Sequence, residues 1–185
     1  MEKGLTTRKI VTAGVLGAIA ILLGVTRLGF IPVPTAAGNA TIMHVPAIIG
    51  GVMQGPFVGL VIGLIFGVSS FLDATIPLFK DPLVAIVPRL FIGITAYLAY
   101  RSLKGMNEIT AIGVAGFIGA VTNTLLVLLM AVIRGYIAPG VAVTIALTNG
   151  IPEAIVSVII TLAIVVAWKK LDHGANKKSK ISGEL

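Results

Sequence analysis

The sequence contains no cysteine and few charged residues, and each of these absences excludes a class of protein. Without cysteine there can be neither disulfide bonds nor a cysteine-ligated metal site. Only 11% of the residues are charged, whereas 57% are hydrophobic and the mean hydropathy is +1.07. Because a soluble domain needs far more charge on its surface, the chain is predicted to be a polytopic membrane protein. Its loops are too short for a separate soluble domain.

Motifs for several kinds of enzyme are also missing. No glycine-rich segment ends in the Lys-Ser/Thr pair of a nucleotide-binding loop. The serines of FGVSSF, at a height similar to that of His44, lack the following glycine that we expect of an intramembrane protease. The net charge of +7 does not indicate nucleic acid binding, because the basic residues cluster at helix ends. We predict that the chain is no enzyme and holds no metal.

Six apolar segments predict an all-α membrane protein, a bundle of six transmembrane helices. The expected helices cover residues 10–30, 41–54, 57–72, 83–100, 109–133 and 143–168. The second and third are short, so a single re-entrant hairpin is the alternative for them. The first is longer than the apolar core of a cleaved signal peptide, which is the alternative there. Residues 1–174 are predicted to form one transmembrane domain, and 175–185 a polar basic tail that is disordered.

The basic residues lie unevenly at the two ends of the expected bundle, which predicts its orientation. Six spans place both termini on one side of the membrane. That side would carry ten basic residues and the other side three, namely Arg27, Lys80 and Arg134. Since basic residues favour the cytoplasmic side, both termini are predicted to be cytoplasmic. Arg89 is counted on neither side, because it falls inside the expected fourth helix.

The stretch IPVPTAAGNATIMHVP over residues 31–46 is uncharged without being uniformly apolar. It cannot cross a bilayer as a plain helix, because lipid offers no partners to its backbone groups. We predict a structured loop that covers a cavity and then enters the next helix. Thr35, Asn39 and Thr41 would supply polar groups there, and Gly38 would supply freedom of the backbone.

Five polar side chains are expected at one depth, between the outer surface and the middle of the membrane: His44, Arg89, Asn123, Asn149 and Glu153. An ionisable residue at membrane depth is costly and indicates a functional site. No comparable set falls in the inner half, which indicates a pocket open to the outside. Three members adjoin a proline, and the carbonyl groups that proline frees can serve a ligand. A local break in the sixth helix is expected near Gly150 and Pro152.

The chemistry of this set favours a small, partly polar organic ligand. The guanidinium of Arg89 suits a carboxylate or phosphate, and the amides of Asn123 and Asn149 both donate and accept. Glu153 can accept from a hydroxyl or an amide, and Asn39 and Thr41 would contribute from the loop. Alternatives remain for each residue: a structural Arg89–Glu153 ion pair, asparagines that only join helices, and a solvated His44.

Small residues recur every four positions in the expected first, third and fifth helices, which lets helices approach closely in lipid. In the third and fifth helices we interpret them as packing within the fold. In the first helix, Ala13, Gly14, Gly17 and Ala18 form a stripe that is open to a partner protein.

The sequence resembles the substrate-binding S components of energy-coupling factor (ECF) vitamin transporters over nearly its whole length. The resemblance is carried by TIMHVPAIIGGVMQGPFVGLVIGLIFGVSSF, by DPLVAIVPRLFIGITAYLAY, by the six spans with basic cytoplasmic ends and by the small stripe of the first helix. It is strongest to the pantothenate and riboflavin group. Such a protein sits in the cell membrane of a prokaryote and binds a vitamin from outside.

The resemblance also implies partners. In the family a transmembrane coupling subunit and two cytoplasmic ATPases drive uptake, so ATP is used by partner subunits and this chain holds no cofactor. The coupling subunit would meet Ala13, Gly14, Gly17 and Ala18, where glycine replaces some of the alanines of the family pattern. Pantothenate fits the predicted pocket best, because its carboxylate suits Arg89 and a riboflavin site would want more aromatic surface. Riboflavin, another vitamin, or a scaffold without a ligand are the alternatives.

Overall fold

The computed structural model describes residues 6–32 and 39–182, with the side chains of 32, 39, 40 and 173–182 left out. The described chain is almost entirely helical, as the sequence predicts. Its elements are α1 (Thr7–Val25), β1 (Phe30–Pro32), β2 (Asn39–Thr41), α2 (Val45–Gln54), α3 (Pro56–Leu72), η1 (Pro77–Lys80), α4 (Pro82–Ala85), α5 (Val87–Leu103), α6 (Glu108–Ile133), α7 (Pro139–Ile145), η2 (Ala146–Gly150) and α8 (Ile151–Ser182).

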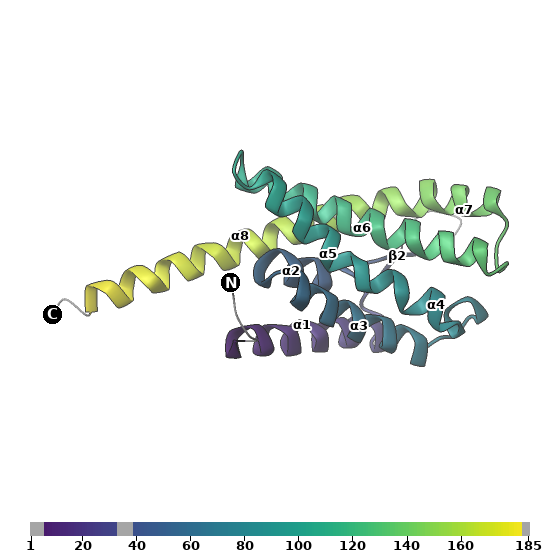
Figure 1. Ribbon diagram of the computed structural model, residues 1–185, viewed down its shortest axis with the longest axis horizontal. Helices are drawn as coiled ribbons and strands as arrows, with labels where there is room; N and C mark the ends of the chain where they lie inside the picture. Colours follow the sequence, from purple (N-terminus) through teal and green to yellow (C-terminus); the bar gives the residue numbers. More distant parts are fainter. Residues whose placement is uncertain (1–5, 33–38, 183–185) are drawn as a thin grey trace.

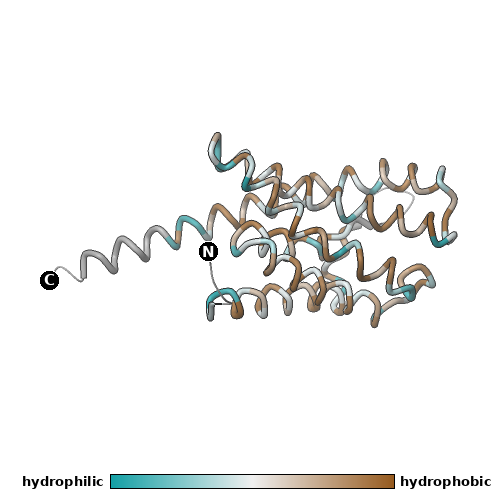
Figure 2. The backbone as a smooth tube through the Cα atoms, viewed as in Figure 1, coloured by the Kyte–Doolittle hydropathy of each residue, from teal (hydrophilic) through white to brown (hydrophobic). Residues whose placement is uncertain are grey.

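The helices run lengthwise beside one another, and both termini lie at the same end of the bundle (Figure 1). Hydrophobic residues cover most of the helix lengths, and hydrophilic residues gather at the two ends (Figure 2). The last part of α8 extends beyond the other helices, and its backbone is helical to Ser182 (Figure 1). The predicted domain boundary at residue 174 and the predicted disorder of the tail stay predictions.

Four helical stretches of the described chain are long and apolar enough to cross a membrane: Thr7–Val25, Pro82–Leu103, Glu108–Ile133 and Pro139–Asp172. The other two apolar helices are shorter, α2 with 10 residues and α3 with 17. The all-helical fold with long apolar helices is therefore confirmed, whereas the six-span count and the side on which the termini lie stay predictions.

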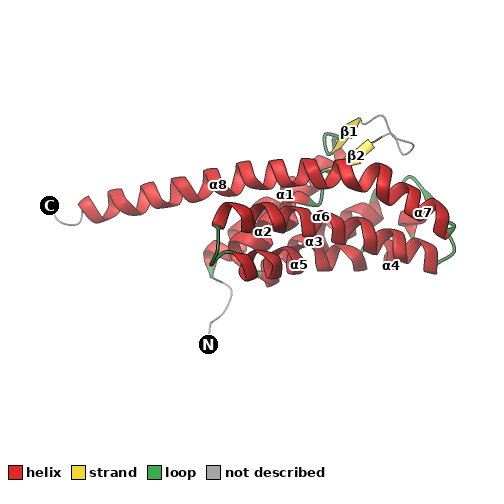
Figure 3. Ribbon diagram, turned by 90° about the horizontal axis from the view of Figure 1, so that it is seen from above, coloured by secondary structure: helices red, strands yellow, loops and turns green. Residues whose placement is uncertain are grey.

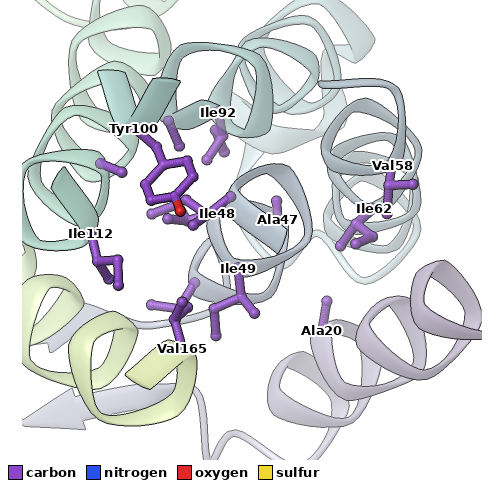
Figure 4. Close-up of a cluster of buried hydrophobic side chains, with 14 of the residues drawn as sticks. Ala20, Ala47, Ile48, Ile49, Val58, Ile62, Ile92, Tyr100, Ile112 and Val165 are labelled. Atoms are coloured by element: carbon purple, nitrogen blue, oxygen red, sulfur yellow. The ribbon is translucent and has the colours of Figure 1, made fainter. Parts of the chain in front are cut away.

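Helix α2 lies at the centre of the bundle, which explains why it is short and apolar all round. All of its residues from Val45 to Val52 are buried. Its Ala47, Ile48 and Ile49 are surrounded by side chains of α1, α3, α5, α6 and α8 (Figure 4). A helix that is hydrophobic on every face belongs inside a fold. Because α2 occupies the core, the surrounding helices form the outer surface of the bundle.

Close backbone contact between α2, α3 and α5 depends on three glycines. A Cβ atom added at Gly59 would lie 2.8 Å from Cα of Gly93 and 2.9 Å from Cα of Gly51. Real Cβ atoms do not approach backbone so closely, so even alanine would force the helices apart. The four-residue spacing of small residues in the third helix thus serves packing within the fold, as predicted.

The first helix is shorter than predicted, and the predicted structured loop between α1 and α2 contains a short hairpin. Helix α1 ends at Val25, and Arg27 takes a left-handed conformation with φ of 61° that turns the chain back. Strands β1 and β2 then pair as an antiparallel hairpin beside α8, with Phe30 opposite Thr41 (Figure 3). Helix α2 consequently starts at Val45 instead of residue 41. Thr35 and Gly38 lie outside the described residues.

Two of the predicted helices are irregular near a proline. The expected fourth helix is divided at Ile86 into α4 and α5, because Pro88 cannot donate a backbone hydrogen bond. The expected sixth helix begins as α7 and passes through the π-helical segment η2 into α8, so the helix is locally widened near Gly150 and Pro152 without the predicted break. Short π-helical segments often occur at functional sites.

An ion pair joins the start of α4 to the end of α6. Nε of Arg134 donates to Oδ2 of Asp81 over 2.6 Å, and Oδ1 of Asp81 accepts from the backbone N–H of Leu83 over 3.0 Å. The sequence analysis gave these two residues no joint role. The pair fixes the connection between α3 and α5 against the turn that follows α6.

This ion pair predicts a pH-dependent stability. The Arg134 guanidinium, helped by the Leu83 N–H, holds the pKa of Asp81 below its ordinary value of 3.8. Because the folded carboxylate is harder to protonate than the unfolded one, the pair stabilises the fold above that value, and this contribution is lost as the pH falls through the lowered pKa. Melting curves of the wild type and of Asp81→Asn should differ at neutral pH and converge below about pH 4. A difference that does not change with pH would contradict this role.

Candidate functional site

A cavity of about 390 Å³ lies at the end of the bundle that is opposite the termini. Its wall is built by the hairpin, α1, α3, the segment with η1, α5, α6, the turn before α7, and the π-helical stretch leading into α8. The volume falls within the range of about 300–1,000 Å³ that is usual for small-molecule sites. The residues that line it are Ala20, Gly24, Arg27, Phe30, Thr41, Met43, Phe66, Ser69, Ser70, Asp73, Ala74, Thr75, Ile76, Leu78, Phe79, Arg89, Asn123, Thr124, Val127, Leu128, Ile137, Ile145, Asn149 and Glu153.

The structure brings five of the seven predicted site residues to this cavity. Thr41, Arg89, Asn123, Asn149 and Glu153 come from β2, α5, α6, η2 and α8, and all of them line it. Four of these side chains are almost fully buried, and Thr41 is half-buried. Polar groups from five separate elements therefore meet in one place, as their common depth predicts.

The other two predicted site residues are His44 and Asn39. His44 is 0% exposed and does not line the cavity, because it immediately precedes the central helix α2. Among the described residues neither of its ring nitrogens has a hydrogen-bond partner. The alternative of a solvated His44 is therefore wrong. The side chain of Asn39 lies outside the part of the chain that the structure describes.

Arg89 is the most constrained group of the site. It is 4% exposed, and its Nη1 donates to the backbone oxygen of Val84 over 2.5 Å. Its guanidinium carbon lies 5.4 Å from the ring centroid of Phe66 and 5.0 Å from that of Phe79, which is cation–π geometry. These three contacts fix the plane of the guanidinium from α3, η1 and α4.

The remaining edge of Arg89 is available for an anion. Its Nε is buried and, within the described chain, neither Nε nor Nη2 has a hydrogen-bond partner. Nε and Nη2 point the same way, in the fork geometry that binds a carboxylate with two parallel hydrogen bonds. A buried cation without a partner is costly. An anionic ligand would remove that cost.

Glu153 makes no direct ion pair with Arg89 in the described structure, although the two charges attract each other electrostatically. Its Oε1 accepts from the backbone N of Thr41 over 2.8 Å and from Oγ1 of Thr41 over 3.2 Å. Its Oε2 accepts from Oγ1 of Thr124 over 3.2 Å. No ion pair links it to Arg89 among the described residues, so the structural pair that we considered is absent. Oε2 keeps capacity for one more hydrogen bond.

The two asparagines place amide groups along the same cavity. Asn123 is buried on α6, and its Oδ1 has no hydrogen-bond partner within the residues described. Asn149 is buried in η2, about one turn before Glu153. Apolar side chains such as Val127, Leu128 and Ile145 complete the wall. The cavity thus combines the unpartnered edge of the buried Arg89 with amide groups on an apolar background.

Several lining residues were missed by the sequence analysis. Phe66 lies in a helix that is apolar throughout, so nothing marks it as a contact of Arg89. Thr124 follows Asn123 directly and is too common a residue in membrane helices to stand out. Ser69 and Ser70 were considered only as protease nucleophiles, although both line the cavity.

Comparison with known proteins gives two findings. A family model described as "ECF transporter, substrate-specific component" matches residues 8–165. The "Pantothenic acid transporter PanT" of Lactococcus lactis subsp. cremoris (strain MG1363) is 33% identical over 156 residues, which cover 70% of this chain and 78% of that protein. Both findings concern transport proteins and not enzymes. The chain therefore belongs to the family of substrate-specific components of ECF transporters.

Proposed function

We propose that this chain binds pantothenate from outside the cell, in the cavity described above, for uptake driven by a separate ATP-hydrolysing module. The observation that carries this proposal is the buried Arg89, whose Nε–Nη2 edge is unpartnered in the described chain and lies at a cavity of suitable volume. Membership of the family and the name of the relative from Lactococcus support the choice of vitamin.

Each part of pantothenate finds a group of matching chemistry. Its single carboxylate would take the Nε–Nη2 edge of Arg89. Its amide and hydroxyl groups would bond to Asn123, to Asn149 and to the free position on Oε2 of Glu153. Its apolar carbons would lie against the aliphatic wall. As part of this proposal, Asn39 and His44 keep the binding roles that the sequence predicts.

The orientation in the membrane follows from charge. We place both termini, which lie at one end of the bundle, in the cytoplasm (Figure 1). The ten basic residues assigned to that end, against three at the other, support this orientation. The cavity, at the opposite end, would then face outward from a prokaryotic cell membrane. Six crossings, two of them by the short α2 and α3, complete this topology.

Helix α1 would provide the contact with the transmembrane coupling subunit, which acts with two cytoplasmic ATPases. Of the predicted contact residues, Gly14 and Ala18 are exposed and Ala13 is half-buried. Gly17 is buried against α3, since an added Cβ would lie 2.7 Å from Cδ1 of Ile65. We therefore assign the docking role chiefly to Gly14 and Ala18.

Calorimetric titration of the purified protein with a panel of vitamins tests the substrate. We expect tight binding of pantothenate and much weaker binding of riboflavin. Preference for riboflavin or for another vitamin would keep the family and overturn the assignment of the cavity. A folded protein that binds none of them would favour a scaffold without a ligand.

A further inference from the structure

We propose that Glu153 is a positioning residue, which ties strand β2 to α6 and α8 and thereby prolongs the stay of a ligand in the cavity. This inference rests on the proposed function, because the residence time is that of pantothenate. It assigns to Glu153 a role that acts through Thr41 and Thr124, in addition to the one hydrogen bond that its Oε2 can still accept from the ligand.

The contacts of Glu153 join three elements that are far apart in the chain. The carboxylate belongs to α8, is 8% exposed, and accepts two hydrogen bonds from Thr41 in β2 and one from Thr124 in α6. Three of its roughly four acceptor positions are thus used within the protein. Hydrogen bonds to an ionised acceptor are stronger than neutral ones, especially where water is excluded.

The hairpin of β1 and β2 needs hydrogen bonds to the helices, such as those that Glu153 accepts, to hold its position. Strands β1 and β2 have only three residues each, and an isolated two-stranded hairpin is marginally stable at best. The hairpin is continued by one further backbone bond, from N of Ile42 to O of Gly29 over 2.9 Å. Strand pairing alone would leave the position of β2 relative to the helices poorly fixed.

The hairpin forms part of the cavity wall, so its position affects the ligand. Phe30 and Thr41 are opposite each other in the strand pair, and both line the cavity. Arg27 lies over the ring of Phe30, with 5.7 Å from its guanidinium carbon to the centroid, and Met43 follows β2 in the same wall. Fixing Thr41 therefore fixes a continuous side of the cavity, and loosening it opens a way out.

The test compares Glu153→Ala with Glu153→Gln. Glutamine keeps an oxygen that can accept from Thr41, and it can donate its amide to the hydroxyl of Thr124. Alanine removes all three bonds. We expect the dissociation rate of pantothenate, measured by chase with unlabelled vitamin, to rise about 10-fold or more in Glu153→Ala, as for the loss of charged hydrogen bonds. In Glu153→Gln it should stay within about 3-fold of the wild type.

A second variant pair separates positioning from direct contact. Thr41→Val removes one donor to Glu153 and should raise the dissociation rate in the wild-type background. In the Glu153→Ala background the same change should have no further effect, because the partner is already gone. Equal effects in both backgrounds, or an equal loss in Glu153→Gln and Glu153→Ala, would overturn the positioning role.

Amide hydrogen exchange, measured on the protein without a ligand, tests the contact between Glu153 and Thr41 independently of the proposed function. The amide of Thr41 donates to Glu153, so the peptide that contains it should exchange faster in Glu153→Ala than in the wild type. An unchanged exchange rate would show that Glu153 does not fix the position of β2, even if pantothenate binds. Failure of the wild type to bind pantothenate would instead refute the proposed function and leave the exchange result valid. Thr124→Val, which removes only the bond to Oε2, serves if the alanine variant does not fold.

Discussion

Replacing Arg89 with alanine is expected to weaken pantothenate binding by about 2–5 kcal/mol, or roughly 30- to 4,000-fold in Kd. The carboxylate of the ligand would lose the Nε–Nη2 edge and enter a site without the buried positive charge of Arg89. Truncating one partner of a buried charge pair has a large cost for that reason. Calorimetric titration of the purified variant measures the change directly.

Two comparisons make the result specific to the carboxylate. Arg101→Ala, at the opposite end of the bundle, removes the same charge and should bind like the wild type. The alcohol analogue of pantothenate lacks the carboxylate, so it should lose little on going from the wild type to Arg89→Ala. If pantothenate itself bound Arg89→Ala with unchanged affinity, Arg89 would not be its anion partner.

Gly14→Leu is expected to abolish uptake while leaving ligand binding normal. A Cβ added at Gly14 meets nothing within 4 Å, so the larger side chain fits the fold and projects from α1. It would block the close helix approach that small residues permit in lipid. Ala18→Leu, on the same exposed face, should behave alike. Uptake of labelled pantothenate by cells, beside titration of the purified variants, separates transport from binding.

The matched control for these changes is Ile19→Leu, which keeps the side-chain volume at another exposed position of α1. It should transport like the wild type. Normal uptake by Gly14→Leu and Ala18→Leu would show that α1 is not the docking face. Loss of binding as well as uptake would point to a defect of the fold.

The membrane class and the polar set were predictable because charge is scarce in this chain. An arginine or a glutamate inside an apolar helix stands out, and its depth follows from counting residues along the helix. Arg89, Asn123, Asn149 and Glu153 were therefore predicted at one depth from sequence alone, and in the structure all four line one cavity. The hydrogen-bond partners of these residues could not be predicted, because the depth of a side chain does not indicate which neighbouring side chain it faces.

The differences between the sequence analysis and the structure have physical causes that involve contacts between elements. His44 was expected at the depth of the other polar residues, but the helix that it precedes is the core of the bundle, which buries it completely, and it is not among the residues that line the cavity. The hairpin of β1 and β2 was not predicted, since three-residue strands leave almost no pattern in a sequence. The early end of α1 depends on Arg27 in a left-handed conformation, which its residue type does not indicate.

The most direct test of the account is calorimetric titration of the wild-type protein with pantothenate and with its alcohol analogue, side by side. The account predicts tight binding of pantothenate and binding of the alcohol that is weaker by about 30-fold or more, because only the carboxylate can use the free edge of Arg89. Equal affinity for both compounds would contradict the role of Arg89. Binding of neither would contradict pantothenate as the substrate.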